Sequence, residues 1–398
     1  MKTTGIVRGI DSLGRIVLPK ELRTNMHIDK DSKLEIFVEG DQIILKKHRP
    51  AGSCDFCGEL AADMAQYEGY CICPACRAKI AALKTEKENH MSQMTEFTLP
   101  SCVPGRTLHA FRCVPEGEVR AILQLSHGMV EFIDRYKPLA EYLAARGILV
   151  TGHDHLGHGG SIRTRADYGY FAQPDGNRAV LDDLHAVTAL TKQLYPGVPY
   201  FLLGHSMGSF YARQYLCEWG GELDGAIIMG TGFQPKALVA TARALCRVLA
   251  VFFGWEHRSK LVADLSFLGY NRGLEGRTPQ DWLNRDQAEV DKYRADERCM
   301  FTFTLNAYYS MFTGILRLYD PAVLAGVPKD LPLLFLAGDA DPVGERTAGV
   351  RRAIQSLRDA GVRNIESKFY PGARHELLVE TNKAEVFADI AGWLNKQI

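Results

Sequence analysis

The sequence has no long uninterrupted hydrophobic run and no excess charge of either sign. Its 398 residues include 47 Lys and Arg against 47 Asp and Glu, so the formal net charge is zero. The most apolar span, 237–255, contains Arg243 and Arg247, and two central arginines on one helical face argue against a membrane-spanning segment. The residues after Met1 lack the apolar run of a secretory signal. We therefore expect a cytoplasmic protein.

The composition of a disordered or fibrous chain is also lacking. Hydrophobic residues make up 46% and charged residues 24% of the sequence, which is typical of globular proteins. At roughly 150 residues per domain, the length predicts two or three domains. Disulfides are not expected in a reducing compartment, so most of the ten cysteines should be free thiols or metal ligands.

Four cysteines form two CxxC pairs, Cys54 with Cys57 and Cys73 with Cys76. Their spacing follows the pattern in which four thiolates close a tetrahedral zinc site with no open position. The sequence therefore predicts a structural zinc that stabilises residues 51–89. The alternative is a redox CxxC or unrelated thiols. Cys71 does not have the spacing to replace Cys73.

Residues 1–50 alternate apolar and polar side chains with a period of two. The pattern predicts four short strands, at 6–10, 15–18, 34–38 and 43–47. Pro19 is well placed to begin a short helix that runs through Arg23, because a first-turn residue needs no N–H. A unit this small buries too little apolar surface to be stable alone, so we expect it to dimerise.

A resemblance to the AbrB/SpoVT/MazE swapped-hairpin family is carried by three strings, TGIVR, DSLGRIVLPKELR and LEIFVEGDQIILKK. The resemblance implies a small β domain that binds DNA as a dimer, with Arg8, Arg15 and Arg23 as the contacts. Arginines can neutralise phosphates and donate to base edges. The alternative is that these arginines are merely solvated and the domain only dimerises the chain. A cysteine-rich tail follows the DNA-binding module in some members of this family.

After a charged helix at 77–87 and a polar linker at 90–97, a separate domain is expected over 98–398. Strands and helices alternate there, which predicts a mainly parallel sheet covered on both faces. At 204–208 the string GHSMG lies between a strand and a helix, the arrangement that exposes a nucleophilic serine. Ligands of such folds bind at the carboxyl ends of strands, so the loops there should form the site.

Three further positions complete a candidate catalytic set. Ser206, Asp341 and His375 follow one another in the chain order of an α/β-hydrolase triad. His375 would move the proton of Ser206, and Asp341 would orient His375. Asp339 is the rival acid, although it more naturally caps its loop. The backbone N–H groups of Met129 and Met207 are the expected oxyanion-hole donors.

The strings SHGMVEFIDRYKPLAEYLAARG, GHDHLGHGGS, LLGHSMGS, GDADPVG and YPGARHELL together resemble the monoacylglycerol lipase/lysophospholipase branch of the α/β-hydrolases. This resemblance covers 98–398 and implies hydrolysis of carboxylic esters of lipid type without a catalytic cofactor. About a hundred residues lie between two sheet strands, far more than a crossover needs. We expect them to form a helical cap over about 232–325.

The apolar span 237–255 would be the main helix of that cap. Its apolar stripe could grip an acyl chain or touch a membrane surface, or simply pack on the core. The function predicted from the whole sequence is a serine ester hydrolase acting on monoacylglycerol- or lysophospholipid-like esters, fused to a dimeric DNA-binding module. The alternative is an AbrB-type transcription regulator whose hydrolase domain acts mainly as a ligand sensor.

Overall fold

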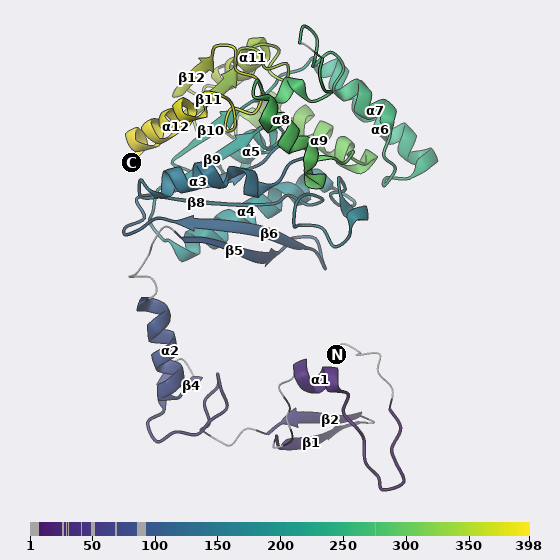
Figure 1. Ribbon diagram of the computed structural model, residues 1–398, viewed down its shortest axis with the longest axis vertical. Coiled ribbons are helices and arrows are strands. Elements are labelled where there is room, and N and C mark those ends of the chain that lie inside the picture. The colour runs from purple at the N-terminus through teal and green to yellow at the C-terminus, as the bar shows by residue number, and fades with distance from the viewer. Residues whose placement is uncertain are drawn as a thin grey trace. The chain divides into compact units, whose positions relative to one another are not determined.

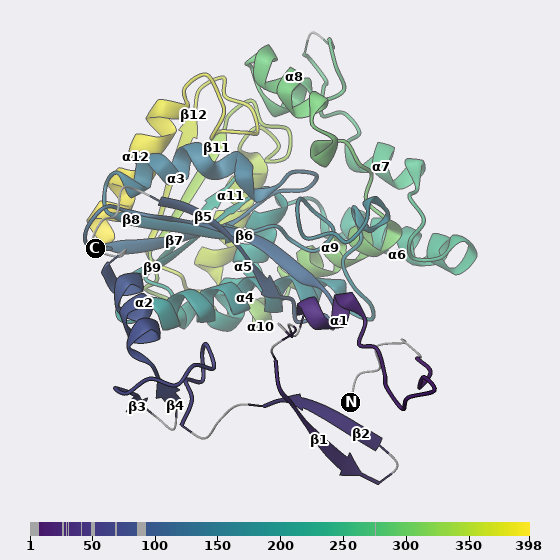
Figure 2. The same cartoon turned by 60° about the horizontal axis from the view of Figure 1, so that its bottom comes forward.

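A computed structural model describes residues 8–25, 28, 30, 32–40, 42–48, 52–67, 70–85, 93–274 and 276–398. The chain divides into two compact units, Met1–Glu88 and Asn89–Ile398. Figure 1 and Figure 2 show the elements of each unit. The two units are described separately below.

In the first unit, a short helix precedes a hairpin of two strands. Helix α1 spans Lys20–Asn25, and strands β1 (Leu34–Glu39) and β2 (Gln42–Lys47) pair in antiparallel register. Residues 8–10 and 15–18 form no strand, although the sequence pattern predicted strands there; residues 6 and 7 lie outside the described residues. A strand needs backbone partners, and β1 and β2 already pair with each other.

The cysteine-rich part of this unit contains a small hairpin and a helix. Strands β3 (Ala65–Tyr67) and β4 (Tyr70–Ile72) are antiparallel. Helix α2 spans Pro74–Thr85 and begins at its proline, where the missing N–H does no harm. The turns and the helix start bring both CxxC pairs into this short stretch of chain.

The second unit is built on an eight-stranded sheet in the order β12-β11-β10-β9-β7-β8-β6-β5. Strands β7 to β12 run parallel, and β6 and β5 are antiparallel at one side. Their bounds are β5 Gln93–Pro100, β6 Thr107–Val114, β7 Ala121–Ser126, β8 Ile148–His153, β9 Tyr200–His205, β10 Gly225–Met229, β11 Leu333–Gly338 and β12 Ile365–Tyr370. The sheet is therefore mixed, with the predicted parallel core.

Strand β5 differs from the prediction that 90–97 is a linker. From Gln93 onward these residues pair with β6, and Phe97 and Leu99 contribute to the core. The sequence pattern did not indicate this edge strand, because many of its residues and those before it are polar.

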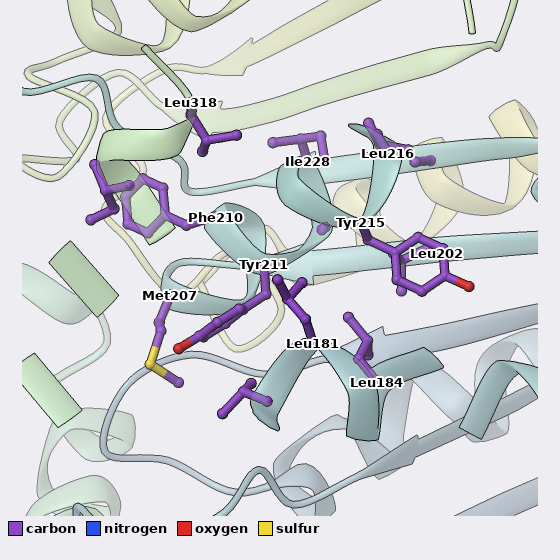
Figure 3. Close-up of a cluster of buried hydrophobic side chains, with 14 of the residues drawn as sticks. Leu181, Leu184, Leu202, Met207, Phe210, Tyr211, Tyr215, Leu216, Ile228 and Leu318 are labelled. Carbon is purple, nitrogen blue, oxygen red and sulfur yellow. The ribbon is translucent and has the colours of Figure 1, made fainter. Parts of the chain in front are cut away.

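Helices cover both faces of the sheet. Helices α3 (Lys137–Ala144) and α12 (Lys383–Gln397) pack with one buried cluster. Helices α4 (Gly176–Leu194), α5 (Met207–Trp219) and α11 (Ala348–Asp359) belong to the other. Figure 3 shows side chains of α4 and α5 in this second cluster, among them Leu181, Met207 and Tyr211. Burial on both faces explains why the central strands are almost wholly apolar.

Between β10 and β11 the chain forms a group of helices. These are α6 Lys236–Phe253, α7 Lys260–Ser266, α8 Gln287–Ala295, α9 Leu305–Arg317 and α10 Pro321–Leu324, with 3₁₀ turns η4 Asp281–Leu283 and η5 Glu297–Cys299. Helix α6 buries Val239 and Cys246 but exposes Val251, Phe252 and Phe253. It therefore packs on the core and also presents apolar side chains to solvent. Among the described residues, no helix is long and apolar enough to cross a membrane.

Candidate active site

Ser206 occupies a sharp turn between β9 and α5. Its φ is 52°, a left-handed conformation that is unfavourable for a residue with a side chain. The turn needs glycines on both sides because of close packing. A Cβ on Gly204 would lie 2.4 Å from the carbonyl oxygen of Gly208, and one on Gly208 would lie 2.0 Å from that of Ser126. The turn leaves Ser206 partly exposed at the carboxyl end of β9.

His375 and Asp341 form a buried pair. His375 Nδ1 lies 2.9 Å from Asp341 Oδ2, and the other carboxylate oxygen accepts the Val343 N–H at 2.9 Å. The side chains of His375 and Asp341 are 2% and 0% exposed. His375 Nε2 is buried and makes no hydrogen bond with any described residue. An ionised Asp341 accepts a hydrogen bond from Nδ1–H, so in the neutral imidazole Nε2 carries the lone pair.

Asp339 has a different partner. Its Oδ1 accepts the N–H of Gly372 at 2.6 Å, so this carboxylate joins the loops after β11 and β12. The structure therefore brings Asp341, and not Asp339, to His375.

Ser206 and His375 approach each other around Gly230. The Ser206 N–H donates to the carbonyl of Met229 at 3.0 Å. On the next residue, a Cβ added to Gly230 would lie 3.1 Å from His375 Cε1 and 3.2 Å from His205 Cδ2. The rings of His205 and His375 are 4.8 Å apart. The serine turn and the imidazole therefore share one corner of the sheet.

The loop after β7 brings Met129 to the same corner. A Cβ on Gly128 would lie only 3.1 Å from Ser206 Cβ. His127 Nδ1–H donates to the Gly128 carbonyl at 2.8 Å, and in a trans peptide the Met129 N–H points the opposite way. Met207 begins α5, so its N–H has no partner one turn earlier within the helix. Both amides are in the region that the sequence predicted for the oxyanion hole.

A buried carboxylate, Glu131, supports this loop from behind. Its Oε1 accepts the Gly128 N–H at 2.5 Å and the Tyr136 hydroxyl at 2.9 Å, and it lies 3.0 Å from His205 Nδ1. Its Oε2 accepts from Arg135 at 3.1 Å. One carboxylate thus holds the loop after β7, which contains Gly128 and Met129, and the histidine that precedes Ser206.

This network continues to the loop of His375. Arg135 forms two hydrogen bonds with Glu376, at 2.5 and 2.9 Å, and His205 Nε2 lies 3.2 Å from the His375 carbonyl. Sequence reasoning missed these supporting residues. The four-residue spacing of Glu131 and Arg135 was the available signal, because such pairs meet on a helical turn.

Burial and charge together set the ionisation of this network. Burial alone would lower the pKa of His205, but the hydrogen bond and charge of Glu131 outweigh it and raise that pKa. Burial alone would raise the pKa of Glu131, but His205 and Arg135 lower it well below its usual range. The two residues therefore form a buried ion pair beside Ser206.

Cap residues contact both sides of the site. The Trp282 ring lies 5.1 Å from the His375 ring. The Tyr293 hydroxyl donates to the carbonyl of Val130 at 2.8 Å. Arg374, next to His375, donates to carbonyls of the η4 segment. The η4 and α8 segments of the cap therefore contact the loops that contain His375 and Val130.

Asp154, His155 and His158 lie in the loop after β8, where residues of these types could bind a metal but more often hold their loop. Asp154 accepts N–H groups from Ile133 and Gly160 at 2.7 Å each. His155 Nε2 lies 3.1 Å from Ser126 Oγ, and His158 Nδ1 lies 3.0 Å from the Leu156 carbonyl. These contacts favour the loop-supporting role.

In the first unit, the four predicted cysteines meet. The Sγ atoms of Cys54, Cys57, Cys73 and Cys76 all lie within 4.8 Å of one another. The Cys57 and Cys73 sulfurs are 3.6 Å apart, close to the separation of about 3.8 Å that tetrahedral Zn–S bonds of about 2.3 Å require. Cys71 Sγ instead contacts the Gly52 carbonyl. The donor set and its geometry fit one metal ion.

The three predicted DNA contacts lie on the surface of this unit. Arg8 is exposed, and the Arg15 side chain is 69% exposed and pairs with Asp11 at 2.8 Å. Arg23 Nε donates to the Leu18 carbonyl at 3.2 Å. Arg15 therefore follows the turn at 11–14 and pairs back to Asp11 at its start, while Gly14 supplies the positive φ of 75° that the turn needs.

Comparisons with known proteins match each unit separately. Residues 117–382 match the family described as serine aminopeptidase, S33, and residues 7–53 match the one described as antidote-toxin recognition MazE, bacterial antitoxin. Monoglyceride lipase of Mus musculus is 31% identical over 292 residues, 71% of this chain and 85% of its own. The putative transition state regulator Abh of Bacillus subtilis is 48% identical over 67 residues, 17% of this chain and 73% of its own.

A solved structure agrees with the match of the second unit to hydrolases. A thermostable carboxyl esterase from Bacillus coagulans superposes with a TM-score of 0.70 at 26% identity, covering 77% of this chain and 99% of the esterase. The N-terminal region is AbrB-like, as the sequence predicted. Through residues 117–382 the chain belongs to the family of α/β-hydrolases described as serine aminopeptidase, S33, and within that family it is a serine hydrolase of carboxylic esters.

Proposed function

We propose that the protein hydrolyses monoacylglycerol- or lysophospholipid-like esters through Ser206, Asp341 and His375. The observation that carries this proposal is the buried His375–Asp341 pair, whose Nε2 makes no hydrogen bond with a described residue and which lies at the same corner of the sheet as the strained turn of Ser206. Strain at a partly exposed serine is typical of a nucleophile that the fold holds in place. The proposed reaction needs no metal or organic cofactor.

In the proposed reaction each group has one task. As Ser206 Oγ bonds to the ester carbon, His375 Nε2 takes its proton, and the Met129 and Met207 N–H groups bind the carbonyl oxygen. When the C–O bond to the alcohol breaks, the same proton passes to the leaving oxygen. Water then attacks the acyl-enzyme in the same way and releases a carboxylic acid and free Ser206. Asp341 stays ionised and holds the tautomer of His375.

The lipid character of the substrate rests on the cap and the relatives. Monoglyceride lipases are among the similar proteins, and this chain covers 85% of the length of the human and mouse enzymes. Helix α6 exposes Val251, Phe252 and Phe253 beside Arg247, which is also exposed. An apolar surface edged by positive charge suits contact with the surface of a lipid aggregate or membrane.

A direct test compares ester hydrolysis by the wild type with that by Ser206→Ala, over monoacylglycerols and lysophospholipids of several chain lengths. Ser356→Ala on α11 is a matched serine control. We expect Ser206→Ala to lose hydrolysis and the control to keep it. Equal turnover by Ser206→Ala would refute the proposed nucleophile. A ligand sensor without chemistry has no use for a buried acid–base pair, so the sensor alternative is not favoured.

We also propose that residues 1–50 bind DNA as part of a dimer. Many apolar side chains of this small unit face solvent: Ile10, Leu13, Ile16, Val17, Ile36, Val38 and Ile43 are each more than half exposed. A second copy of the unit would cover such a surface, as expected for a fold too small to be stable alone. The match to AbrB-like regulators supports DNA as the ligand.

Residues 51–89 would carry a structural zinc ion held by Cys54, Cys57, Cys73 and Cys76. Four thiolates leave no coordination position for a substrate, so the metal would stabilise this segment and take no part in hydrolysis. Thiolate ligands and DNA as a partner would both suit a reducing cytoplasm, which is the compartment we propose. Measured zinc far below one ion per chain, in protein never exposed to a chelator, would refute this site.

A further inference from the structure

We propose that Tyr293 of the cap is a positioning residue for the oxyanion loop and acts through the backbone of Val130. Val130 follows Met129 directly and has a φ of 56°. This left-handed conformation is a genuine outlier for a β-branched residue and persists only where its surroundings enforce it. The inference rests on the proposed function, because it assigns the Met129 N–H to the oxyanion hole.

Two hydrogen bonds enforce the conformation of Val130, one on each side of the residue. Its N–H donates to His158 Nε2 at 3.4 Å, and its carbonyl accepts the Tyr293 hydroxyl at 2.8 Å. His158 comes from the loop after β8, whereas Tyr293 comes from α8 of the cap. The longer bond is the weaker one. The cap therefore supplies the better of the two contacts.

Tyr293 is itself firmly held. Its side chain packs with Phe132, Leu283 and Cys299 in a separate small cluster, and the Arg135 guanidinium lies 5.0 Å from its ring centre. Burial raises the pKa of Tyr293 well above its usual range, so the hydroxyl keeps the proton that it donates. A rigid donor of this kind can fix the direction of the Val130 carbonyl.

Tyr293 thereby affects the position of Met129, which lies between Gly128 and Val130. On one side, His127 fixes the Gly128 carbonyl at 2.8 Å. On the other side, Tyr293 fixes the Val130 carbonyl. When the Tyr293 contact is lost, Val130 can relax toward negative φ and the Met129 backbone can shift with it, so that His127 alone holds the Gly128–Met129 peptide whose N–H faces the carbonyl oxygen of the substrate. The oxyanion hole is then complete only while α8 of the cap is in place.

The test uses Tyr293→Phe, which keeps the ring and removes only the hydroxyl. With a short p-nitrophenyl ester, we expect kcat to fall about tenfold with little change in KM, because the lost contact acts on the transition state. Binding of an alkyl boronic acid, which mimics the tetrahedral intermediate, should weaken by the same factor. Tyr309→Phe, a cap tyrosine on α9 that packs on Trp255, is the control and should match the wild type.

Substitution of Val130 separates positioning from general damage to the cap. Glycine adopts positive φ without cost, so in a Val130→Gly background Tyr293→Phe should change kcat less than about twofold. In a Val130→Ala background the Cβ remains, and the loss should stay near tenfold. An equal loss in the Gly and Ala backgrounds, or no loss in Tyr293→Phe alone, would overturn the inference. Absence of hydrolysis by the wild type would instead refute the proposed function.

Discussion

Replacing Glu131 with Gln tests the ion pair behind Ser206. The substitution keeps the size of the side chain but removes the charge that faces His205 at 3.0 Å and Arg135 at 3.1 Å. The side chains of Glu131 and His205 are only 6% and 5% exposed, so solvent offers little compensation. Breaking a buried pair of this kind costs about 3 to 5 kcal/mol. The substitution should also lower the rate of ester hydrolysis, because Glu131 accepts the N–H of Gly128 next to Met129.

Thermal unfolding measures the loss. For a domain of this size, about 1.5 °C of Tm corresponds to each kcal/mol, so Glu131→Gln should unfold about 5 to 8 °C below the wild type. Glu141→Gln, an exposed glutamate on α3, is the matched control and should change Tm by less than about 2 °C. A Glu131→Gln protein as stable as the control would refute a buried ion pair at this position.

The contribution of the Glu131–His205 pair to stability depends on pH with a definite sign. The pKa of Glu131 is depressed in the folded state, so its contribution to stability is present above its ordinary pKa of 4.5 and is lost as the pH falls through the folded value. The pKa of His205 is raised, so its contribution is full below 6.5 and is lost as the pH rises through the folded value. The Tm difference between wild type and Glu131→Gln should therefore be largest between pH 4.5 and pH 6.5, where both contributions are present. A difference that grows steadily above pH 8 would contradict this pairing.

Three further changes have expected outcomes. Asp341→Asn should lower kcat by up to about 10⁴-fold because it destroys the tautomer of His375, whereas Asp339→Asn should cost far less; equal losses in an ester assay would contradict the assignment of the acid. Cys57→Ser should lower the zinc content and Tm of the N-terminal unit and leave ester hydrolysis intact, which metal analysis and calorimetry check. Arg15→Ala should weaken DNA binding and reduce the slope of affinity against salt concentration; an unchanged slope in a titration would argue against a phosphate contact.

The sequence was most informative where one pattern had only one structural solution. The buried strands around Ser206 form where the apolar runs predicted them, because a strand covered on both faces must be apolar throughout. The four cysteines meet, as the spacing of the two CxxC pairs predicted. Strand β5 was missed because an edge strand can remain largely polar.

The supporting contacts of the site could not be predicted, for a different reason. Arg135 binds Glu376, which is 241 residues away in sequence, and nothing local indicates that contact, whereas the four-residue spacing of Glu131 and Arg135 was a local signal. The positive φ of Val130 is likewise invisible in the sequence, where valine favours extended backbone. Such features depend on how separate loops meet, which only the folded chain specifies.

The most direct test of the account is covalent labelling of the nucleophile. A lipid-like fluorophosphonate should inactivate the wild type with one adduct per chain, and peptide mass spectrometry should locate that adduct on Ser206. The Ser206→Ala variant should remain unlabelled, and His375→Ala should react far more slowly. An adduct on another serine, with hydrolysis lost in step, would contradict the central claim.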